Sequence, residues 1–574
     1  MNLWTSPETI PPEVELLVRR WRLPTERMED VKRLLAAQKE GGTACLMTGP
    51  ATDSSAAWGE ACQIIRHTDS PNLVRPPSPL VVRQHSRTTH LQSWRFFQAE
   101  QFIARDLLAR AAQPAPVLAR PVAELLADLG KDQVNSRQEQ AIHCALNHSL
   151  ALITGGPGTG KTHTLARLLA LLIGAHPGAN LVIRLAAPTG KAAERMNEAV
   201  EAATAQLKDK VSDAVFNRLK ITATGATTLH KLLGFKPRSG SCHHNADTPV
   251  GCDVLIVDEC SMVDTLMWQA LLAALPATTR LVLLGDPNQL ESVSAGDVLG
   301  SLVRQARALP RSPLGRVWTE LTESIRFNKH PGIGALAQAV VNLHAAEAVE
   351  LLRTHAVPAP ADGLVWLGDH GGRFTWERLP ASVHAALLAV ADAPTPTDAL
   401  AALSGVRVLT AHRENTLGVS GINAAIERHL RHRTGDTDQA NVRQPNQPVI
   451  INQNDAETGL TNGSVGIIMA GSDGVRAAFF PAVPPRRVTL GQLPDHGMAW
   501  AMTIHRSQGS EFNQVVVILP PDESPLATRE LIYTGITRAK DCVHVWGSED
   551  TLRTALGDRA LRCTLLEASL QQLG

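Results

Sequence analysis

A glycine-rich string at 155–162, GGPGTGKT, has residue types and spacing suited to binding a nucleoside triphosphate. It fits the phosphate-binding loop pattern, in which glycines let several backbone N–H groups approach the phosphates. Lys161 can reach the β- and γ-phosphates, and the Thr162 hydroxyl can hold Mg²⁺. The residues expected to surround the nucleotide are Gly155, Gly156, Pro157, Gly158, Thr159, Gly160, Lys161, Thr162 and His163.

Two adjacent carboxylates follow an apolar run in DVLIVDE at 253–259. We expect Asp258 to hold Mg²⁺ directly or through water, and Glu259 to orient and deprotonate the attacking water. Paired acids after a strand are most often a solvated strand end, so this prediction depends on the phosphate-binding loop. Together the two strings predict hydrolysis as well as binding.

The residues around the loop predict the elements that position it. SLALIT at 149–154 is typical of a buried strand. The apolar positions after the lysine recur at helical spacing as Leu165, Leu168, Leu169 and Leu172. Gly174 is a plausible helix stop. A strand, loop and helix in this order direct a helix N-terminus at an anion, which disfavours the alternative of a chance glycine-rich turn.

Strand-like and helical segments alternate along two parts of the chain, which predicts an α/β fold with two tandem RecA-like lobes. The first lobe is expected over 116–325, with strands at 149–154, 181–187, 253–257 and 281–285. The second is expected over 326–574, with strands at 406–411, 515–520 and 543–547. A β-rich stretch at 443–495 predicts a small inserted barrel of the SH3-like type.

Residues 1–115 are expected to form a separate, mostly helical N-terminal domain, which we interpret as a partner-docking unit. Its last part, 91–112, holds four aromatic residues in a chain that is only 4% aromatic. They are Trp94, Phe96, Phe97 and Phe102. Such a cluster is more often local core than a partner surface.

Composition limits the function classes but does not select one. Lys and Arg together number 55, as do Asp and Glu, so bulk charge does not indicate a protein that coats nucleic acid. Residues 1–10 do not resemble a signal peptide, and no apolar stretch is long enough to span a bilayer. The 8 cysteines form no C-x-x-C pair, so we expect reduced thiols in a cytoplasmic protein without membrane contact.

Eight strings occur in the order found in superfamily 1 helicases. They are GGPGTGKT, AAPTGKAAERM (186–196), TTLHKLLG (227–234), VDECSMVD (257–264), GDPNQLESVSAGDVL (285–299), IRF (325–327), TIHRSQGSEF (503–512) and YTGITRAK (533–540). Within that superfamily the chain resembles the RecD family, the alpha subunits of the RecBCD exonuclease V, through TTLHKLLG, HRENTLGVSGIN (412–423) and NGSVG (462–466). The resemblance is strong over 130–550 and weak over the first 115 residues.

The position of some residues and the resemblance together imply further roles in ATP turnover. Gln289, at the end of LVLLGDPNQL, is placed to touch the γ-phosphate and report its loss. Gln138 is similar to the family's glutamine that recognises adenine, which favours ATP. Arg326 and Arg538 resemble two arginines that reach the γ-phosphate across the cleft. A guanidinium from the second lobe stabilises transition-state charge only when the lobes close, whereas the alternative for each arginine is a surface salt bridge.

The resemblance also implies a DNA track across both lobes. The residues expected to contact DNA are Pro188, Thr189, Gly190, Lys191 and His230 in the first lobe, and His505, Gln508, Gly509, Ser510 and Glu511 in the second. Small hydroxyl and amide donors suit contact with phosphate and sugar, as a sequence-independent motor requires. The 5′-to-3′ direction of movement is implied by the resemblance alone.

Residues 235–252, FKPRSGSCHHNADTPVGC, occupy the place of a hairpin that separates strands in relatives. The segment is short and has no large aromatic residue beyond Phe235, so a plain solvent loop is the alternative.

The resemblance implies an ATP- and Mg²⁺-dependent 5′-to-3′ translocase and DNA helicase. It would act with RecB-like and RecC-like subunits in a heterotrimer for double-strand break repair and linear DNA degradation. The first alternative is a free-standing helicase of the same type. A second is an ATPase module that regulates its partners, which the complete second-lobe string TIHRSQGSEF disfavours. A third, intrinsic nuclease activity, lacks an acidic constellation outside the nucleotide site, so nuclease chemistry is expected in a partner.

Overall fold

A computed structural model of the chain describes residues 27–47, 62–65, 80–85, 88–115, 124, 135–176, 181–208, 210–223, 225–355, 362–369, 371–433, 445–521, 524–557 and 562–574. The N-terminal residues 1–10, on which we based the absence of a signal peptide, lie outside this part. Among the described residues, no helix has the length and apolarity needed to span a bilayer.

A six-stranded parallel sheet forms the centre of the first lobe, in the order β12-β5-β11-β10-β6-β7. Its strands are β5 (Leu150–Gly155), β6 (Ile183–Ala187), β7 (Thr227–Thr228), β10 (Val254–Val257), β11 (Arg280–Gly285) and β12 (Trp318–Leu321). All four predicted strands are confirmed. Every residue of β5, β10 and β11 is buried, as expected for parallel strands covered by helices on both faces.

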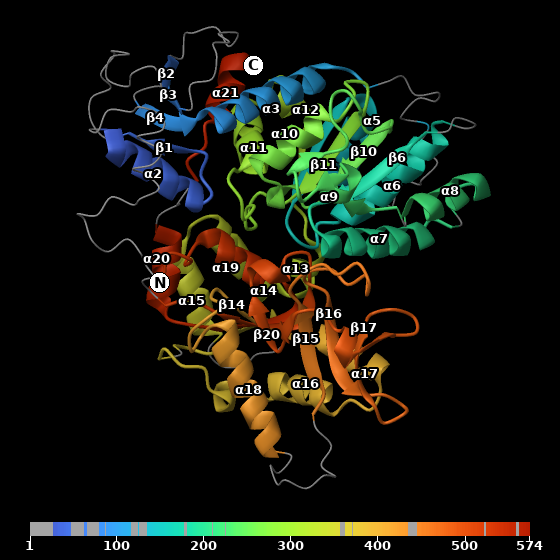
Figure 1. Cartoon of the computed structure of the whole chain (residues 1–574), viewed down its shortest axis with the longest axis vertical. Coiled ribbons are helices and arrows are strands. Elements are labelled where there is room, and N and C mark those ends of the chain that lie inside the picture. Colours follow the sequence, from blue (N-terminus) through green and yellow to red (C-terminus); the bar gives the residue numbers. More distant parts are fainter. Residues whose placement is uncertain are drawn as a thin grey trace.

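The helices of the first lobe pack on this sheet (Figure 1). They are α5 (Ser136–Asn147), α6 (Lys161–Gly174), α7 (Gly190–Ala205), α8 (Asp213–Ala223), α9 (Leu229–Leu232), α10 (Thr265–Ala273), α11 (Val298–Ala308) and α12 (Pro313–Val317). The helix predicted after the phosphate-binding loop is α6, and its four predicted leucines are all buried. Helix α6 begins directly after Gly160, which has a φ of 84°.

A second parallel sheet, of five strands in the order β13-β22-β21-β14-β20, forms the second lobe. Its strands are β13 (Leu364–Trp366), β14 (Val406–Thr410), β20 (Ala501–Thr503), β21 (Phe512–Ile518) and β22 (Ala539–Trp546). Its helices are α13 (Ile325–Lys329), α14 (Pro331–Val341), α15 (Ala345–Thr354), α16 (Ala381–Asp392), α17 (Pro396–Gly405), α18 (Val419–Arg433), α19 (Arg529–Ile536) and α20 (Glu549–Gly557). The three predicted strands are confirmed as β14, β21 and β22.

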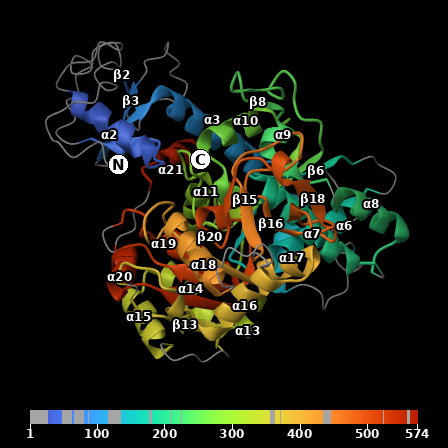
Figure 2. The same cartoon turned by 60° about the horizontal axis from the view of Figure 1, so that its bottom comes forward.

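The predicted β-rich insertion is an antiparallel five-stranded sheet in the order β18-β17-β16-β15-β19. Its strands are β15 (Gln447–Ile451), β16 (Val465–Ala470), β17 (Arg476–Phe480), β18 (Arg486–Thr489) and β19 (His496–Met498). It has its own small core, which includes Ile451, Ile468 and Phe480. Figure 2 brings the insertion and the second lobe to the front. Its SH3-like character stays a prediction.

The expectation of a mostly helical N-terminal domain is not confirmed, because a sheet accompanies its helices. The described part of 1–115 contains a four-stranded sheet, β1-β4-β3-β2, beside two helices. These elements are α2 (Met28–Lys39), β1 (Ala44–Leu46), β2 (Cys62–Ile65), β3 (Leu80–His85), β4 (Thr88–Ser93) and α3 (Trp94–Ala112). These strands lack the continuous apolar run of a strand such as β10 (VLIV): β3 is LVVRQH and β4 is TTHLQS, so they gave no clear strand signal beside the helical patterns of α2 and α3.

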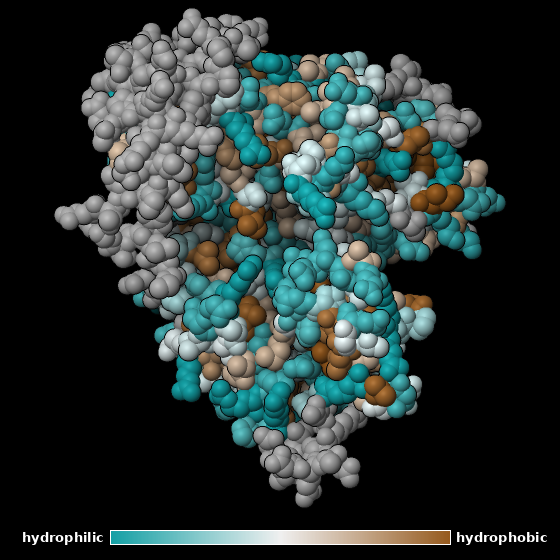
Figure 3. Space-filling view, in the orientation of Figure 1, coloured by the Kyte–Doolittle hydropathy of each residue, from teal (hydrophilic) through white to brown (hydrophobic). Residues whose placement is uncertain are grey.

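The aromatic residues at the start of α3, Trp94, Phe96, Phe97 and Phe102, are all only partly buried, and Phe102 packs against the first-lobe core. The alternatives of local core and partner surface stay open for this cluster. The buried face of α3 instead carries small and aliphatic residues, including Ile103 and Leu107, which join the first-lobe core. Polar side chains cover most of the described surface on the face shown in Figure 3, with apolar residues in small separate groups.

The last helix, α21 (Leu566–Leu573), was expected within the second lobe but packs against α3 and α11. Its buried Leu566 and Leu570 belong to the first-lobe core. Figure 1 shows this helix at the end of the chain beside α3, far from α20.

Candidate nucleotide cleft and nucleic-acid groove

A cleft of about 530 Å³ lies between the two lobes and collects most of the residues predicted to handle a nucleotide. The first lobe contributes the loop from Gly156 to His163 together with Asp258, Glu259 and Gln289. Arg326, Glu511 and Arg538 line the same cleft. Residues far apart in the chain therefore meet at the carboxyl ends of parallel strands, where ligands bind in open α/β sheets.

The phosphate-binding loop is held in a shape that requires glycine. Gly158 and Gly160 have φ values of 76° and 84°, a region that residues with a Cβ rarely adopt. A Cβ on Gly156 would lie 2.9 Å from the Tyr533 hydroxyl of the second lobe. The Lys161 Nζ donates to the carbonyls of Gly155 and Gly156 at 2.5 and 3.1 Å, so its ammonium lies within the loop's cradle.

The two predicted carboxylates lie at the end of β10. The Glu259 N–H donates to Asp258 Oδ1 at 2.8 Å, and Glu259 itself has a φ of 54°. A non-glycine residue in this region is strained, and such strain is concentrated at functional sites. Burial raises the pKa of Asp258, and Lys161 opposes that rise. Burial, followed by the neighbouring Asp258, raises the pKa of Glu259, which makes its carboxylate a stronger base than an ordinary glutamate.

The donor set of the cleft fits Mg²⁺. Thr162 provides a hydroxyl and Asp258 a carboxylate, and both line the cleft. Magnesium prefers such oxygen ligands and is usually completed by phosphate oxygens and water. When bound, the ion would neutralise charge on the β- and γ-phosphate oxygens.

Arg538 is buried, at 3% exposure, and joins the second lobe to Gln289 of the first. Its Nη2 donates to Gln289 Oε1 at 2.9 Å. Its Nε and Nη1 donate to the carbonyls of Thr534 and Ser510 at 3.1 and 3.3 Å. The position beside Gln289 and Glu259 agrees with an arginine that follows the γ-phosphate, and the surface salt bridge alternative does not hold for Arg538.

Arg326 lies on α13, whose Phe327 packs against the second-lobe core, and its reach to the γ-phosphate stays a prediction. Its helix α13 is anchored to the phosphate-binding loop, because the Ile325 N–H donates to the Gly158 carbonyl at 3.1 Å. The Arg326 Nη2 forms an ion pair with Glu511 Oε1 at 2.7 Å. Its Nη1 is buried without a hydrogen-bond partner among the described residues, which leaves a donor for a ligand in the cleft.

Glu511, predicted to contact DNA, instead lies in the nucleotide cleft. Its Oε2 is 4.0 Å from Arg195, and Arg326 binds its other oxygen. Burial opposes ionisation of this carboxyl, but Arg326 and then Arg195 lower its pKa. A carboxylate held by two guanidiniums is poorly suited to approach DNA phosphates, and contact of Glu511 with DNA stays a prediction.

Gln138 lies behind the phosphate-binding loop and does not line the cleft. Its Nε2 donates to the Thr159 carbonyl at 3.2 Å. Its Oε1 accepts from the Asn135 N–H, and Asn135 in turn accepts from the Gln138 N–H, which forms a capping box at the start of α5. Recognition of adenine by Gln138 stays a prediction.

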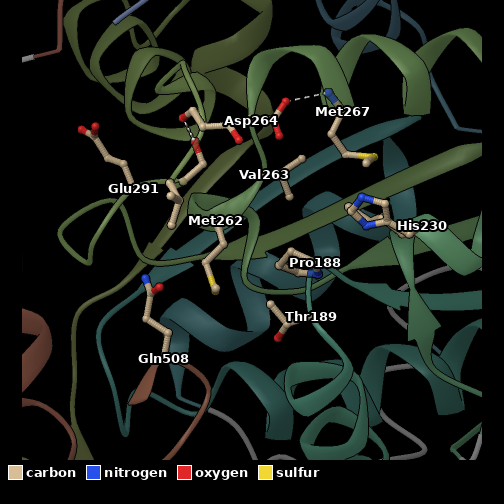
Figure 4. A pocket seen from close by; sticks show the side chains of 13 residues that line it. Pro188, Thr189, His230, Met262, Val263, Asp264, Met267, Glu291 and Gln508 are labelled. Atoms are coloured by element: carbon tan, nitrogen blue, oxygen red, sulfur yellow. Dashed lines mark hydrogen bonds between the residues drawn. The ribbon is translucent and has the colours of Figure 1, made fainter. Parts of the chain in front are cut away.

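A second, smaller hollow of about 200 Å³ brings together four of the predicted DNA residues, Pro188, Thr189, His230 and Gln508. Figure 4 shows Gln508 on one side of this groove and Thr189, Pro188 and His230 on the other. Its remaining wall is formed by 262–264, Met267 and the loop residues 291–294. We call this hollow the groove.

The other predicted DNA residues lie outside the groove lining. Gly190 faces Thr461 of the insertion, and burial lowers the pKa of the partly buried Lys191 to about 7. Gly509 lines the nucleotide cleft. Ser510 is buried at 1% exposure, so its side chain is not available to DNA without movement. His505 is partly buried in the short turn before Gln508.

The predicted hairpin exists as β8 (Phe235–Lys236) paired with β9 (Ser241–Cys242). The Phe235 ring packs edge-on against His230, with ring centroids 5.0 Å apart. The Phe235 side chain is therefore in contact with a residue that lines the groove. Strand separation by this hairpin stays a prediction.

Sequence reasoning missed three residues that the structure places in or beside the cleft: Arg195, Asp286 and Tyr533. Asp286 Oδ2 accepts from the Tyr533 hydroxyl and from Gln289 Nε2, each at 3.1 Å. All three lie within strings that we had matched to helicases, so the strings signalled the region. The partner of each residue depends on how the two lobes pack against each other, which the strings do not specify.

Comparison with known proteins identifies the family. A model described as an AAA domain matches residues 138–295, and one described as a UvrD-like helicase C-terminal domain matches 498–546. The chain is 38% identical over 514 residues to the RecBCD enzyme subunit RecD of Mycolicibacterium smegmatis, covering 88% of this chain and 86% of that protein. The chain belongs to the RecD family.

The chain is also similar to other curated proteins and to a solved structure. It is 33% identical over 490 residues to RecD of Haemophilus influenzae, covering 77% of this chain and 73% of that protein. It is 29% identical over 423 residues to the ATP-dependent RecD2 DNA helicase of Deinococcus radiodurans, covering 74% of this chain and 50% of that protein. Among solved structures, the Pif1 helicase from Candida albicans matches with a TM-score of 0.40 at 16% identity, over 73% of this chain and 96% of that one.

Replacement of Arg538 by alanine tests its position in the RecD-family cleft. We expect kcat for ATP hydrolysis to fall about 100-fold or more, because a guanidinium beside the γ-phosphate acts mainly on transition-state charge. The KM for ATP should change less than about fivefold. Steady-state phosphate release measures kcat and the KM for ATP. The control is Arg553→Ala on α20, because the carboxylate partners of Arg553 lie at the surface. Equal losses in kcat and binding would instead indicate a structural arginine.

Proposed function

We propose that this chain is an ATP-dependent 5′-to-3′ DNA translocase and helicase, and the RecD-type subunit of a RecBCD-like complex. The observation that carries the proposal is one segment, 286–290, that lines the nucleotide cleft through Gln289 and hydrogen-bonds Thr534 of the second lobe and Gln508, a residue of the groove. A motor needs such a connection, because hydrolysis at one site has to change the grip at another.

The nucleotide cleft supplies the groups for hydrolysis. Lys161 and the loop amides bind phosphate charge, while Thr162 and Asp258 hold Mg²⁺. Glu259 takes the proton of the attacking water, which its raised pKa favours. Arg538, and Arg326 through its unpartnered Nη1, stabilise the charge that develops on the γ-phosphate.

The segment 286–290 connects that chemistry to the groove. Gln289 accepts a hydrogen bond from Arg538 in the cleft. The next residue, Leu290, donates its N–H to Thr534 Oγ1 at 2.8 Å and accepts from Gln508 Nε2 at 3.0 Å. Gln508 lines the groove. Loss of the γ-phosphate would therefore change the contacts of Gln289. The adjacent residue Leu290 would transmit this change to Gln508 through their hydrogen bond.

The partners follow from family membership and coverage. We expect RecB-like and RecC-like subunits in a heterotrimer that acts on double-strand ends, with nuclease chemistry in a partner. A free-standing helicase is the second candidate. The chain is 38% identical to the M. smegmatis RecD and 29% identical to the D. radiodurans RecD2, and this higher similarity supports the subunit.

The test uses the full purified chain with matched partial duplexes. We expect single-stranded DNA to stimulate ATP hydrolysis and unwinding to require a 5′ tail, with no unwinding of the 3′-tailed duplex. Stimulation absent at all DNA concentrations would contradict the motor assignment, and a requirement for a 3′ tail would contradict the direction. Affinity capture from the native cell, with stoichiometry, then separates a heterotrimer from a chain that acts alone.

A further inference from the structure

The C-terminal segment, residues 562–573, returns from the second lobe and joins the N-terminal sheet to the first lobe. Its helix α21 buries Leu566 and Leu570 in the first-lobe core. Arg83 of β3 donates to the Leu565 carbonyl at 3.2 Å and to Ser569 Oγ at 3.1 Å. Because these polar contacts are buried, the segment holds its place through directed bonds as well as apolar packing.

Arg562, at the start of this segment, grips the loop 291–296. Its Nε forms an ion pair with Glu291 Oε2 at 2.7 Å. Its Nη1 contacts three carbonyls of the same loop, those of Ser292, Ser294 and Gly296, at 2.6, 3.1 and 3.3 Å. The loop contains no helix or strand. Its other hydrogen bonds include those from the Ser292 hydroxyl to the Ser294 and Gly296 carbonyls, at 2.7 and 3.4 Å, and one from the Thr265 N–H to the Ala295 carbonyl, at 3.1 Å.

The N-terminal domain touches the same point. The Gly296 N–H donates to the Gly41 carbonyl at 2.7 Å, and Gly41 lies directly against the Arg562 guanidinium, with no room for a Cβ between them. The Thr43 N–H donates to the Cys563 carbonyl at 2.9 Å. Arg562 is therefore enclosed between the N-terminal domain and the loop.

The loop 291–296, which Arg562 binds, forms one wall of the groove. Glu291 to Ser294 line it opposite Thr189 and His230, and Val293 projects into solvent at 81% exposure. The loop also follows directly on Leu290, which carries the contact to Gln508. A change in the loop's shape would thus alter this wall of the groove.

We infer that Arg562 is a positioning residue that holds the loop 291–296 in the shape that binds single-stranded DNA, so that the C-terminal segment and the N-terminal domain set the affinity of the motor for its track. This inference rests on the proposed function, because it requires the groove to bind DNA. Arg562 acts through the loop and not by contacting phosphate, which makes the role separable from that of a DNA ligand.

Arg562→Ala in the full chain tests the role by ATP hydrolysis over a range of oligo-dT concentrations. We expect the DNA concentration for half-maximal stimulation to rise about tenfold, while kcat at saturating DNA and the KM for ATP stay within about twofold. Arg562→Lys should recover part of the loss, because an ammonium can bind Glu291 but not all three carbonyls together. Glu567→Gln is the matched control: it removes the ion pair of the same segment with Arg304, 2.6 Å long, without touching the loop.

The salt dependence of oligo-dT binding separates positioning from direct contact. A lost phosphate contact lowers the slope of log Kd against log salt by about one, whereas a lost positioning contact leaves the slope unchanged. An unchanged slope with weaker binding supports the inference. A lowered slope, an unchanged half-maximal concentration, or an equal loss in Glu567→Gln would overturn it.

A second variant keeps the test decisive if Arg562→Ala does not fold. Glu291→Gln removes the ion pair but keeps the side-chain volume and the carbonyl contacts, so we expect a rise of about threefold in the half-maximal DNA concentration. No rise in this variant would overturn the inference. Wild-type chain that shows no DNA stimulation would instead contradict the proposed function, so the two failures are distinguishable.

Discussion

Replacing Lys161 by glutamine is expected to abolish ATP hydrolysis, lowering kcat about 1,000-fold or more. The ammonium lies in the cradle formed by the Gly155 and Gly156 carbonyls, where it can reach phosphate oxygens. It also lowers the pKa of both Asp258 and Glu259, so its loss makes the two buried carboxyls harder to ionise. Phosphate release in the presence of single-stranded DNA measures the effect, and unwinding should stop with it.

The matched control for this variant is Lys540→Gln, which removes an exposed lysine at the edge of the same cleft. Its kcat should change less than about tenfold, since no contact ties it to the phosphate-binding loop. DNA binding and assembly with partners should survive in Lys161→Gln, because α6 remains anchored by its buried leucines. Retained DNA-stimulated hydrolysis would contradict the assignment of the loop.

Replacing Glu259 by glutamine is expected to preserve ATP binding but lower kcat about 100- to 10,000-fold, the usual contribution of a general base. The wild-type rate should fall as pH decreases through the raised pKa of Glu259, because the protonated carboxyl cannot accept the proton of water. That acid limb should begin at a higher pH than for an ordinary glutamate. The residual rate of the glutamine variant should not show it.

Nucleotide binding, followed with a fluorescent ATP analogue, separates this role from a structural one. The control is Glu320→Gln on β12, whose carboxylate pairs with Arg307 at the surface. Loss of nucleotide binding as severe as the loss of turnover would argue against a general base. So would a kcat that keeps the wild-type acid limb after the substitution.

Local signals predicted the catalytic half of the molecule well. The string at 155–162 and the apolar runs before and after it carry their own information, because a glycine loop between a buried strand and a helix is specified by contiguous residues. The same holds for Asp258 and Glu259 at the end of β10. The parallel sheets followed from the alternation of strand-like and helical segments.

The N-terminal domain shows where local signals failed. Its strands β3 (LVVRQH) and β4 (TTHLQS) mix polar with apolar residues, so they lack the continuous apolar run by which buried strands such as β10 were recognised. The aromatic residues cluster at the start of α3, but the buried face of this helix includes Ala99, Ile103 and Leu107. Aromatic residues mark burial only when another element covers them, and that depends on packing.

The sequence by itself determined the chemistry available to this protein and the order of its elements, since the phosphate loop, the carboxylate pair and the strand periods are properties of contiguous residues. Only the tertiary structure decided which long polar side chains pair. Glu511 joined Arg326 in the cleft, Gln508 bound the Leu290 carbonyl, and Arg562 gripped the groove loop. These partners lie 185 to 270 positions apart, and buried charged and polar groups must find partners wherever the packed lobes bring them.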